Sequence, residues 1–205
     1  MINEVIFDLE TKTFFDETGD FDPSRLGVSI VSVYQRKLDG NLKEREGKIL
    51  SFWESDLPNI WPYFFDADRI VGFNSKRFDV AVLAPYAPRD IARLPHFDIL
   101  EEIKRIHGRR VSLNKVAKGT LGRGKIDSGA NAPAYWKSHD PVKLAKLKKY
   151  CEEDVLLTKE LYDHGLTKGF LSFTNFWNTP FSIKVDFSYP PEFSPKSQKS
   201  QMGLF

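Results

Sequence analysis

Acidic residues placed inside apolar stretches are the feature of this sequence that most constrains its fold. The four acids are found in VIFDLET, VGFNSKRFD and YCEED, as Asp8, Glu10, Asp79 and Asp154. A buried carboxylate is costly, and several that converge on one point repel one another unless cations lie between them. The sequence therefore predicts a fold that gathers these three stretches around divalent metal ions.

Each acid also has a simpler explanation when it is taken alone. Asp8 and Glu10 are two residues apart on a predicted strand, so both leave the same face, as an acid pair on an edge strand would. Asp79 stands where a helix begins, a position that the helix dipole favours for an acid. Tyr150 and Asp154 are four residues apart on a predicted helix and share a face. The apolar neighbours of Asp8 and Glu10 make a solvated edge pair hard to accept, whereas Asp79 and Asp154 favour a metal site only in combination with them.

The composition is that of one globular domain without a disulfide. The chain has 205 residues, of which 41% are hydrophobic, enough for a sizeable core. Its 30 basic and 28 acidic residues leave a formal charge of +2, which says little about partners. A single cysteine, Cys151, fits a reducing cytoplasm. No apolar run approaches the length of a membrane span and no signal peptide is evident, so we expect a soluble, cytoplasmic protein that does not bind membranes.

Apolar runs, and the turn and capping residues that separate them, predict an α/β fold with a mixed central sheet flanked by helices. Strands are expected over residues 3–10, 27–53 (two strands joined by a hairpin turn at Asp39-Gly40), 69–74 and 94–100. Helices are expected over residues 56–65, 77–87, 101–108, 112–122 and 142–165, the last two ended by Gly122 and Gly165. The stretch 122–136 is predicted to be a loop, the aromatic stretch 170–187 a hairpin, and the Pro- and Ser-rich stretch from Ser188 a flexible tail.

The three acidic stretches, in this order, resemble the motifs of the DEDD exonucleases, the DnaQ-like group within the RNase H-like fold. FDLET resembles the first exonuclease motif, Asn74-x3-Phe78-Asp79 the second and Tyr150-x3-Asp154 the third. The third motif has Tyr four residues before its Asp, and not His five residues before it, so the chain resembles the tyrosine (DEDDy) subtype. Within that subtype it is similar to the proofreading domain of family B DNA polymerases.

This resemblance implies a 3′→5′ exonuclease domain over residues 1–187, with a core of about 4–165 and an extension over 171–187. It implies that Asp8, Glu10, Asp79 and Asp154 bind two Mg²⁺ or Mn²⁺ ions and that Tyr150 is catalytic. It places the substrate against Leu9, Thr11, Asn74 and Phe78. The expected product is a 5′-mononucleotide, released from single-stranded or mismatched DNA during replication or repair.

Aromatic and basic residues outside the motifs are weaker candidates for contact with nucleic acid. Bases could stack on Phe14, Phe15, Tyr135 or Trp136, although each is individually more typical of a core. Lys115, Lys118, Arg123 and Lys125 could contact phosphates, or could form a merely solvated face. The histidines show no spacing typical of metal ligands.

The last five residues resemble the peptide with which bacterial polymerases and repair proteins bind the β sliding clamp. Gln201, Met202, Gly203, Leu204 and Phe205 combine a hydrogen-bonding side chain with two adjacent apolar anchors at the end of a polar linker. The resemblance implies that Gln201, Met202, Leu204 and Phe205 bind the clamp; the alternative is that Leu204 and Phe205 pack on their own domain.

Other functions remain open from the sequence. The same fold could trim RNA 3′ ends, bind nucleic acid or protein without catalysis, or cut internal phosphodiester bonds. The presence of all four carboxylates and Tyr150 argues against a silent domain, and the clamp-like tail favours DNA over RNA.

Overall fold

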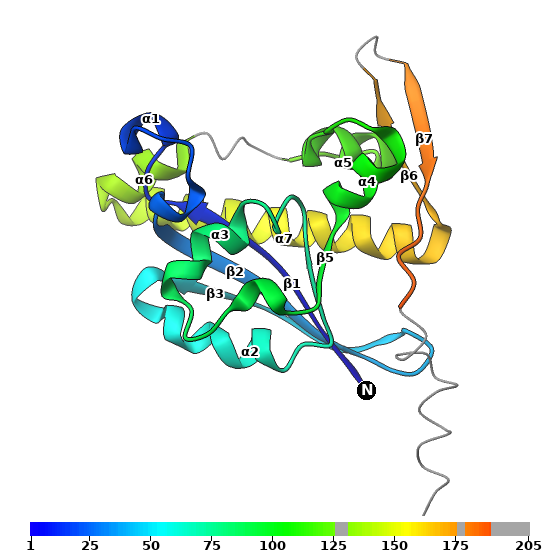
Figure 1. The fold of residues 1–205 in the computed structure, drawn as a ribbon, viewed down its shortest axis with the longest axis horizontal. Coiled ribbons are helices and arrows are strands. Elements are labelled where there is room, and N and C mark those ends of the chain that lie inside the picture. Colours follow the sequence, from blue (N-terminus) through cyan, green and yellow to red (C-terminus); the bar gives the residue numbers. More distant parts are fainter. Residues whose placement is uncertain (126–130, 176–178, 190–205) are drawn as a thin grey trace, which may run out of the picture.

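A five-stranded mixed sheet forms the centre of the computed structural model, which describes residues 1–125, 131–175 and 179–189 (Figure 1). The strands are arranged in the order β3-β2-β1-β4-β5. Their bounds are β1 Ile2–Thr11, β2 Val28–Leu38, β3 Glu44–Trp53, β4 Arg69–Gly72 and β5 His96–Asp98. The first three strands are antiparallel, whereas β4 runs parallel to β1 and β5 runs parallel to β4. This is the RNase H-like fold expected from the sequence.

Helices cover both faces of the sheet. The helices are α1 Phe15–Thr18, α2 Trp61–Phe65, α3 Asp79–Leu83, α4 Ile99–His107, α5 Leu113–Leu121, α6 Ala132–Ser138 and α7 Pro141–Lys168, with short 3-10 turns η1 Pro23–Arg25, η2 Glu54–Ile60, η3 Ala84–Tyr86 and η4 Ile91–Arg93. The long helix α7 crosses one face, where Val155 and Leu161 pack on Ile6. In the described part of the chain, no helix is both long and apolar enough to span a membrane.

Strand β1 divides its side chains between the two faces. Val5, Phe7 and Leu9 lie in the core beneath α2 and α3. The residues that alternate with them face α7, because successive side chains of a strand point to opposite sides. Among these, Ile6 joins the α7 core and Glu4 accepts a hydrogen bond from Tyr162 of α7 at 2.9 Å. Asp8 and Glu10 therefore extend toward α7 at the carboxyl end of β1.

Several element bounds predicted from the sequence were wrong in part. The first half of the predicted helix over 56–65 belongs to the 3-10 turn η2, the predicted helix over 77–87 is divided into α3 and η3, and the predicted strand over 94–100 is only β5. Residues 132–136 of the predicted loop belong to α6, which has Pro133 in its first turn, where proline needs no backbone partner. Helix α7 continues through Gly165 and ends at Gly169, whose φ of 71° is left-handed. Gly165 does not end the helix. It allows the Phe187 ring to approach α7 closely, since a Cβ at Gly165 would lie 2.1 Å from that ring. Residues 126–130 of the predicted loop lie outside the described residues.

The predicted aromatic hairpin is present and packs on α4 and α5. It consists of β6 Phe170–Thr174 and β7 Pro180–Lys184, which pair antiparallel. In Figure 1 the hairpin stands beside α4 and α5, away from α1 and α6. The Thr120 hydroxyl donates to the Ser172 carbonyl and accepts from its N–H, both at 2.9 Å. These bonds fix β6 against the end of α5.

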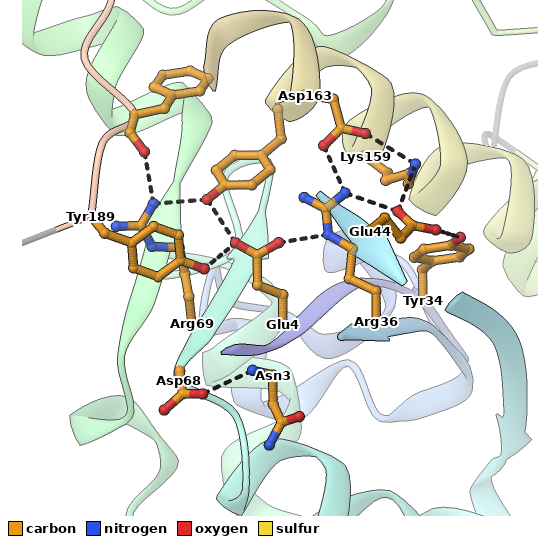
Figure 2. Close-up of polar contacts among 12 residues, drawn as sticks. Asn3, Glu4, Tyr34, Arg36, Glu44, Asp68, Arg69, Lys159, Asp163 and Tyr189 are labelled. Atoms are coloured by element: carbon orange, nitrogen blue, oxygen red, sulfur yellow. Dashed lines mark hydrogen bonds and ion pairs between the residues drawn. The ribbon is translucent and has the colours of Figure 1, made fainter. Parts of the chain in front are cut away.

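A buried polar network fastens the end of the hairpin segment to the amino end of β1 (Figure 2). Arg36 donates to Glu4 at 2.6 Å, and the Tyr189 hydroxyl donates to the same carboxylate. Arg69 donates to Tyr162 at 2.7 Å and to the carbonyls of Phe187 and Ser188 at 2.8 and 2.9 Å. Ser188 and Tyr189, predicted to begin a flexible tail, are thus held by the domain; the rest of that tail, residues 190–205, lies outside the described residues.

We expect Arg69→Met to lower the free energy of unfolding by about 3 kcal/mol, because it leaves Glu4 with less positive charge nearby and two carbonyls without a donor. Urea denaturation followed by circular dichroism would measure the loss. The matched control is Arg93→Met, whose side chain is 88% exposed and which should change stability by less than about 0.5 kcal/mol. Equal losses in the two variants would contradict a special role of the buried network.

Candidate metal and catalytic site

Three carboxylates meet where the carboxyl end of β1 packs on α7. One oxygen from each of Asp8, Glu10 and Asp154 lies within 4.8 Å of the other two. Asp8 and Glu10 share a face of β1, and α7 brings Asp154 to them. The contact is fixed by Cys151, which is buried and donates its thiol hydrogen to the Asp8 carbonyl at 3.4 Å. The sequence prediction that these acids converge is met by the geometry.

The fourth acid, Asp79, reaches the same edge of the sheet by a different route. It begins α3, which follows β4, and β4 runs parallel to β1 with Ile6 opposite Val71. Parallel neighbours end at the same edge, so Asp79 lies beside the β1 acids. Its carboxylate is 5% exposed and accepts a hydrogen bond from the backbone of Leu9. Asp79 is adjacent to the three-residue group and is not one of the three within 4.8 Å.

Burial and mutual repulsion change the acidity of all four groups. Burial, and then the charges of Asp79, Asp154 and Glu10, raise the pKa of Asp8 well above its usual value. The pKa of Glu10 is raised to about 8, mainly by burial and then by Asp154. The pKa of Asp79 is raised to about 7, again mainly by burial. These shifts show an excess of negative charge that divalent cations would relieve.

One ammonium group already offsets part of this charge. Lys125 forms an ion pair with Asp154, and its charge lowers the pKa of Asp154 against the larger effect of burial, which raises it. The Lys125 backbone is held by Asn114, whose side-chain oxygen accepts from its N–H at 3.0 Å. Lys125 was predicted from the sequence as a phosphate contact, but here it contacts a carboxylate. The donor set of four acids, with Lys125 paired to Asp154, fits hard divalent metal ions.

Tyr150 lies one turn before Asp154 on α7, on the side facing α6. Its ring centroid is 6.2 Å from that of Tyr135. Tyr135 belongs to α6, and Trp136 of that helix stacks on Trp53 with ring centroids 6.0 Å apart. The Lys12 Nζ atom lies 5.9 Å from the Trp136 ring centroid. Tyr135 and Trp136, the stacking candidates from the sequence, therefore lie beside Tyr150. Both rings are themselves packed on neighbouring aromatic residues.

Helix α1 lies next to α6 and to the segment before α3. Phe15 packs on Phe78 with ring centroids 6.2 Å apart, and Phe14 is 43% exposed. Lys137 of α6 pairs with Glu17 of α1, which joins these two helices. In Figure 1 these two helices lie together at the carboxyl end of β1. Leu9 is 5% exposed and Thr11 donates to the Thr13 carbonyl at 3.0 Å, so both reinforce the strand end.

The loop from β4 to α3 is held by an acid that sequence analysis missed. Asp98 ends β5 and accepts hydrogen bonds from the N–H groups of Asn74 at 2.8 Å and Lys76 at 3.1 Å. It also caps α4 by accepting from Leu100 at 2.9 Å. Asn74 has a left-handed φ of 67°, which Asn tolerates better than most residues. An Asp just before a predicted helix signals a cap, but its second set of partners depends on the tertiary fold.

The other basic candidates have different surroundings. Arg123 pairs with Glu160 of α7, Lys118 lies against Gly124 between Arg123 and Lys125, and Lys115 lines the cavity beside the hairpin. The clamp-like residues Gln201, Met202, Leu204 and Phe205 lie outside the described residues.

Comparisons with known proteins give one family model and several solved structures. A family model described as the RNase_H superfamily matches residues 5–166. The family B DNA polymerase of the archaeon Pyrobaculum calidifontis is similar in structure, with a TM-score of 0.56 and 24% identity over 80% of this chain. Escherichia coli exonuclease I, solved with a dA16 oligonucleotide, matches 80% of the chain with a TM-score of 0.43 and 14% identity. The chain spans 24% of the polymerase and 41% of exonuclease I. No curated protein sequence gives a match.

We expect the metal-free protein to lose stability as the pH rises from about 5 to 8. Glu10 and Asp79 keep their protons to about pH 8 and 7 in the folded state, whereas their ordinary pKa values are 4.5 and 3.8. The folded state then binds more protons than the unfolded chain, so the free energy of unfolding falls with pH, by on the order of 5 kcal/mol. Urea denaturation in EDTA at pH 5, 6.5 and 8 would measure it.

The variant Glu10→Gln should flatten this pH dependence, while Asp56→Asn, at an exposed position in η2, should leave it unchanged. Added Mg²⁺ should stabilise the wild-type protein more at pH 8 than at pH 5.5, because metal ligands must be deprotonated. A wild-type stability that rises over this pH range, with Glu10→Gln behaving in the same way, would contradict a repulsive acid cluster.

Proposed function

The chain belongs to the RNase H superfamily, and from this membership we propose that it is a metal-dependent 3′→5′ exonuclease that acts on DNA. The observation that carries the proposal is the meeting of Asp8, Glu10 and Asp154 within 4.8 Å, with Asp79 beside them. The order of the three motifs and the place of Tyr150 before Asp154 support the tyrosine subtype of the DEDD exonucleases. Residues 1–187 would form the exonuclease domain, with a terminal segment over 188–205.

The carboxylates would hold two divalent ions, Mg²⁺ or Mn²⁺. When bound, such ions supply Lewis acidity and neutralise the negative charge that develops on a phosphodiester during hydrolysis. The protein contributes a fixed arrangement of ligands: β1 holds Asp8 and Glu10, the Leu9 backbone holds Asp79, and the Cys151 contact holds α7. This preorganisation means that little rearrangement is needed during the reaction.

Tyr150 would orient the attacking water through its hydroxyl group, which can both donate and accept hydrogen bonds. Asn74 and Phe78 would position the terminal nucleotide, because the Asp98 bonds fix their loop and Phe78 packs on Phe15. Leu9 and Thr11, at the carboxyl end of β1, would contact the terminal nucleotide through their backbone, because their side chains lie on the face of β1 opposite to Asp8 and Glu10. Attack of water on the last phosphodiester would release a nucleoside 5′-monophosphate and leave a new 3′-hydroxyl end.

We expect a 5′-labelled single-stranded DNA to shorten from its 3′ end in Mg²⁺ or Mn²⁺ and to stay intact in EDTA. Asp79→Asn keeps the shape of the side chain and should lower the rate at least about 100-fold, with the fold retained by circular dichroism. The control Asp56→Asn should cleave at the wild-type rate. A gel ladder would measure both variants on DNA and on RNA of the same sequence.

The three alternative functions give different gels. A ladder on RNA alone would move the function to RNA trimming, and internal fragments would indicate an endonuclease. Intact strands under all metal conditions, with binding retained, would support a catalytically silent domain. Wild-type activity in Asp79→Asn would contradict the assignment of the site.

We also propose that the last five residues bind a bacterial β sliding clamp. Deletion of residues 201–205 should reduce binding to immobilised clamp at least tenfold, because Leu204 and Phe205 would be its apolar anchors. Surface plasmon resonance would measure this, with the double variant Lys37→Ala/Lys48→Ala, remote from the terminus in sequence, as the control. Unchanged clamp binding after the deletion would contradict the proposal.

A further inference from the structure

A cavity of about 620 Å³ lies between the β6–β7 hairpin and the segment from the end of α4 to α5. Its lining includes His107, Arg109, Arg110, Lys115, Phe173 and Phe181. We call it the hairpin groove. The family model ends at residue 166, so the hairpin wall belongs to the C-terminal extension of this chain.

One wall of the groove is cationic. Arg109, Arg110 and Lys115 are all exposed. Among the described residues, none of the three has a carboxylate within 4 Å, unlike Arg105 or Arg123 nearby. Three exposed positive charges without carboxylate partners favour an anionic ligand, and their position on the α4–α5 connection and the first turn of α5 favours an extended one.

The other wall is aromatic. The rings of Phe173 and Phe181 are 5.7 Å apart, and His107 packs on both at 5.0 Å. Phe181 is 42% exposed, so part of its ring is free to contact a ligand. A cationic wall facing an exposed aromatic is the combination that binds single-stranded nucleic acid, in which phosphates pair with cations and bases stack on rings.

The hairpin wall is rigid where it meets α5. Besides the two Thr120 bonds, Gly119 lies so close to β6 that a Cβ on it would be 2.5 Å from the Phe173 Cα atom. The aromatic wall is therefore set in place before any ligand arrives, which lowers the entropy cost of binding.

The groove is continuous with the candidate catalytic site through one side chain. Arg110 lines the groove and donates to the Asn74 side-chain oxygen at 2.8 Å. Asn74 belongs to the loop that leads to Asp79, and Asp98 fixes its backbone. A strand whose 3′ end lies at the carboxylates would therefore pass Asn74 and Arg110 before it meets Phe181.

We propose that the hairpin groove binds the single-stranded part of the polynucleotide substrate that lies on the 5′ side of the terminal nucleotides. The proposal rests on the exonuclease function proposed above and adds the residues that would set its preference for longer strands. It assigns phosphate contacts to Arg109 and Lys115 and a base-stacking contact to Phe181.

The test is fluorescence anisotropy in EDTA, so that hydrolysis does not interfere, with labelled dT4, dT16 and U16. We expect the wild-type protein to bind the 16-mers more tightly than dT4. Arg109→Ala/Lys115→Ala should weaken 16-mer binding about tenfold and reduce the slope of log K against log salt by about 1.4, because two phosphate contacts are lost. Phe181→Ala should weaken it about tenfold with the salt slope unchanged.

Lys37→Ala/Lys48→Ala is the matched control, because it removes two positive charges from a second hollow of about 350 Å³ on β2 and β3. Circular dichroism would check that each variant is folded. Wild-type 16-mer affinity in both groove variants would overturn the proposal, as would an equal loss in the control. Binding of an acidic peptide in place of both oligonucleotides would also overturn it.

Failure of the two proposals would look different. If the protein cleaves strands but the groove variants bind the 16-mers with wild-type affinity, the groove assignment is wrong and the exonuclease proposal is retained. If no strand is cleaved but the groove variants lose affinity, the groove stands as a binding site and the catalytic assignment falls. Comparable losses of affinity for dT16 and U16 would indicate that the groove binds single strands without distinguishing deoxyribose from ribose.

Discussion

Mutual repulsion among buried carboxylates is the constraint on which the arrangement of this molecule depends. Asp8, Glu10 and Asp154 would separate if the chain allowed it, so the surrounding packing must hold them together. The opposite face of β1 does this: Phe7 and Leu9 are buried beneath α2 and α3, which fixes the strand. On the near face, the Cys151 thiol holds α7 against β1, and the Lys125 ammonium, from the segment after α5, pairs with Asp154.

The same strand and helix meet again at their other ends, with the opposite electrostatic character. There Glu4 is surrounded by Arg36, Tyr162 and Tyr189, so its charge is compensated and no repulsion remains (Figure 2). The compensated Glu4 carboxylate at one end fixes the register of β1 against α7. A shift of one residue would break the Glu4 hydrogen bonds and would turn Asp8 away from Asp154. The stable end thus positions the reactive one.

Sequence patterns predicted most of this fold, for reasons visible in particular residues. Apolar runs identified β1 and β4, and the Ser112 and Gly122 signals bounded α5 correctly. Gly165 led to a wrong prediction of the end of α7. A glycine stands there because the Phe187 ring occupies the space of a Cβ, and the helix continues past it. The carboxylates were recognisable because acids in an apolar strand are costly. Asp98 and Arg110 were not, because their partners on the Asn74 loop are 24 and 36 residues away in sequence.

The Arg69 contacts with Phe187 and Ser188 also decide where the chain leaves the domain. Tyr189 is bound at Glu4, and the strand from Glu4 to Glu10 is about 20 Å long, so the exit point and the carboxylates lie at opposite ends of the sheet. The twelve residues 190–201 have a contour length of about 40 Å. A partner bound at residue 201 would therefore be attached to the domain at the end of the sheet opposite to the carboxylates, within that contour length of Tyr189.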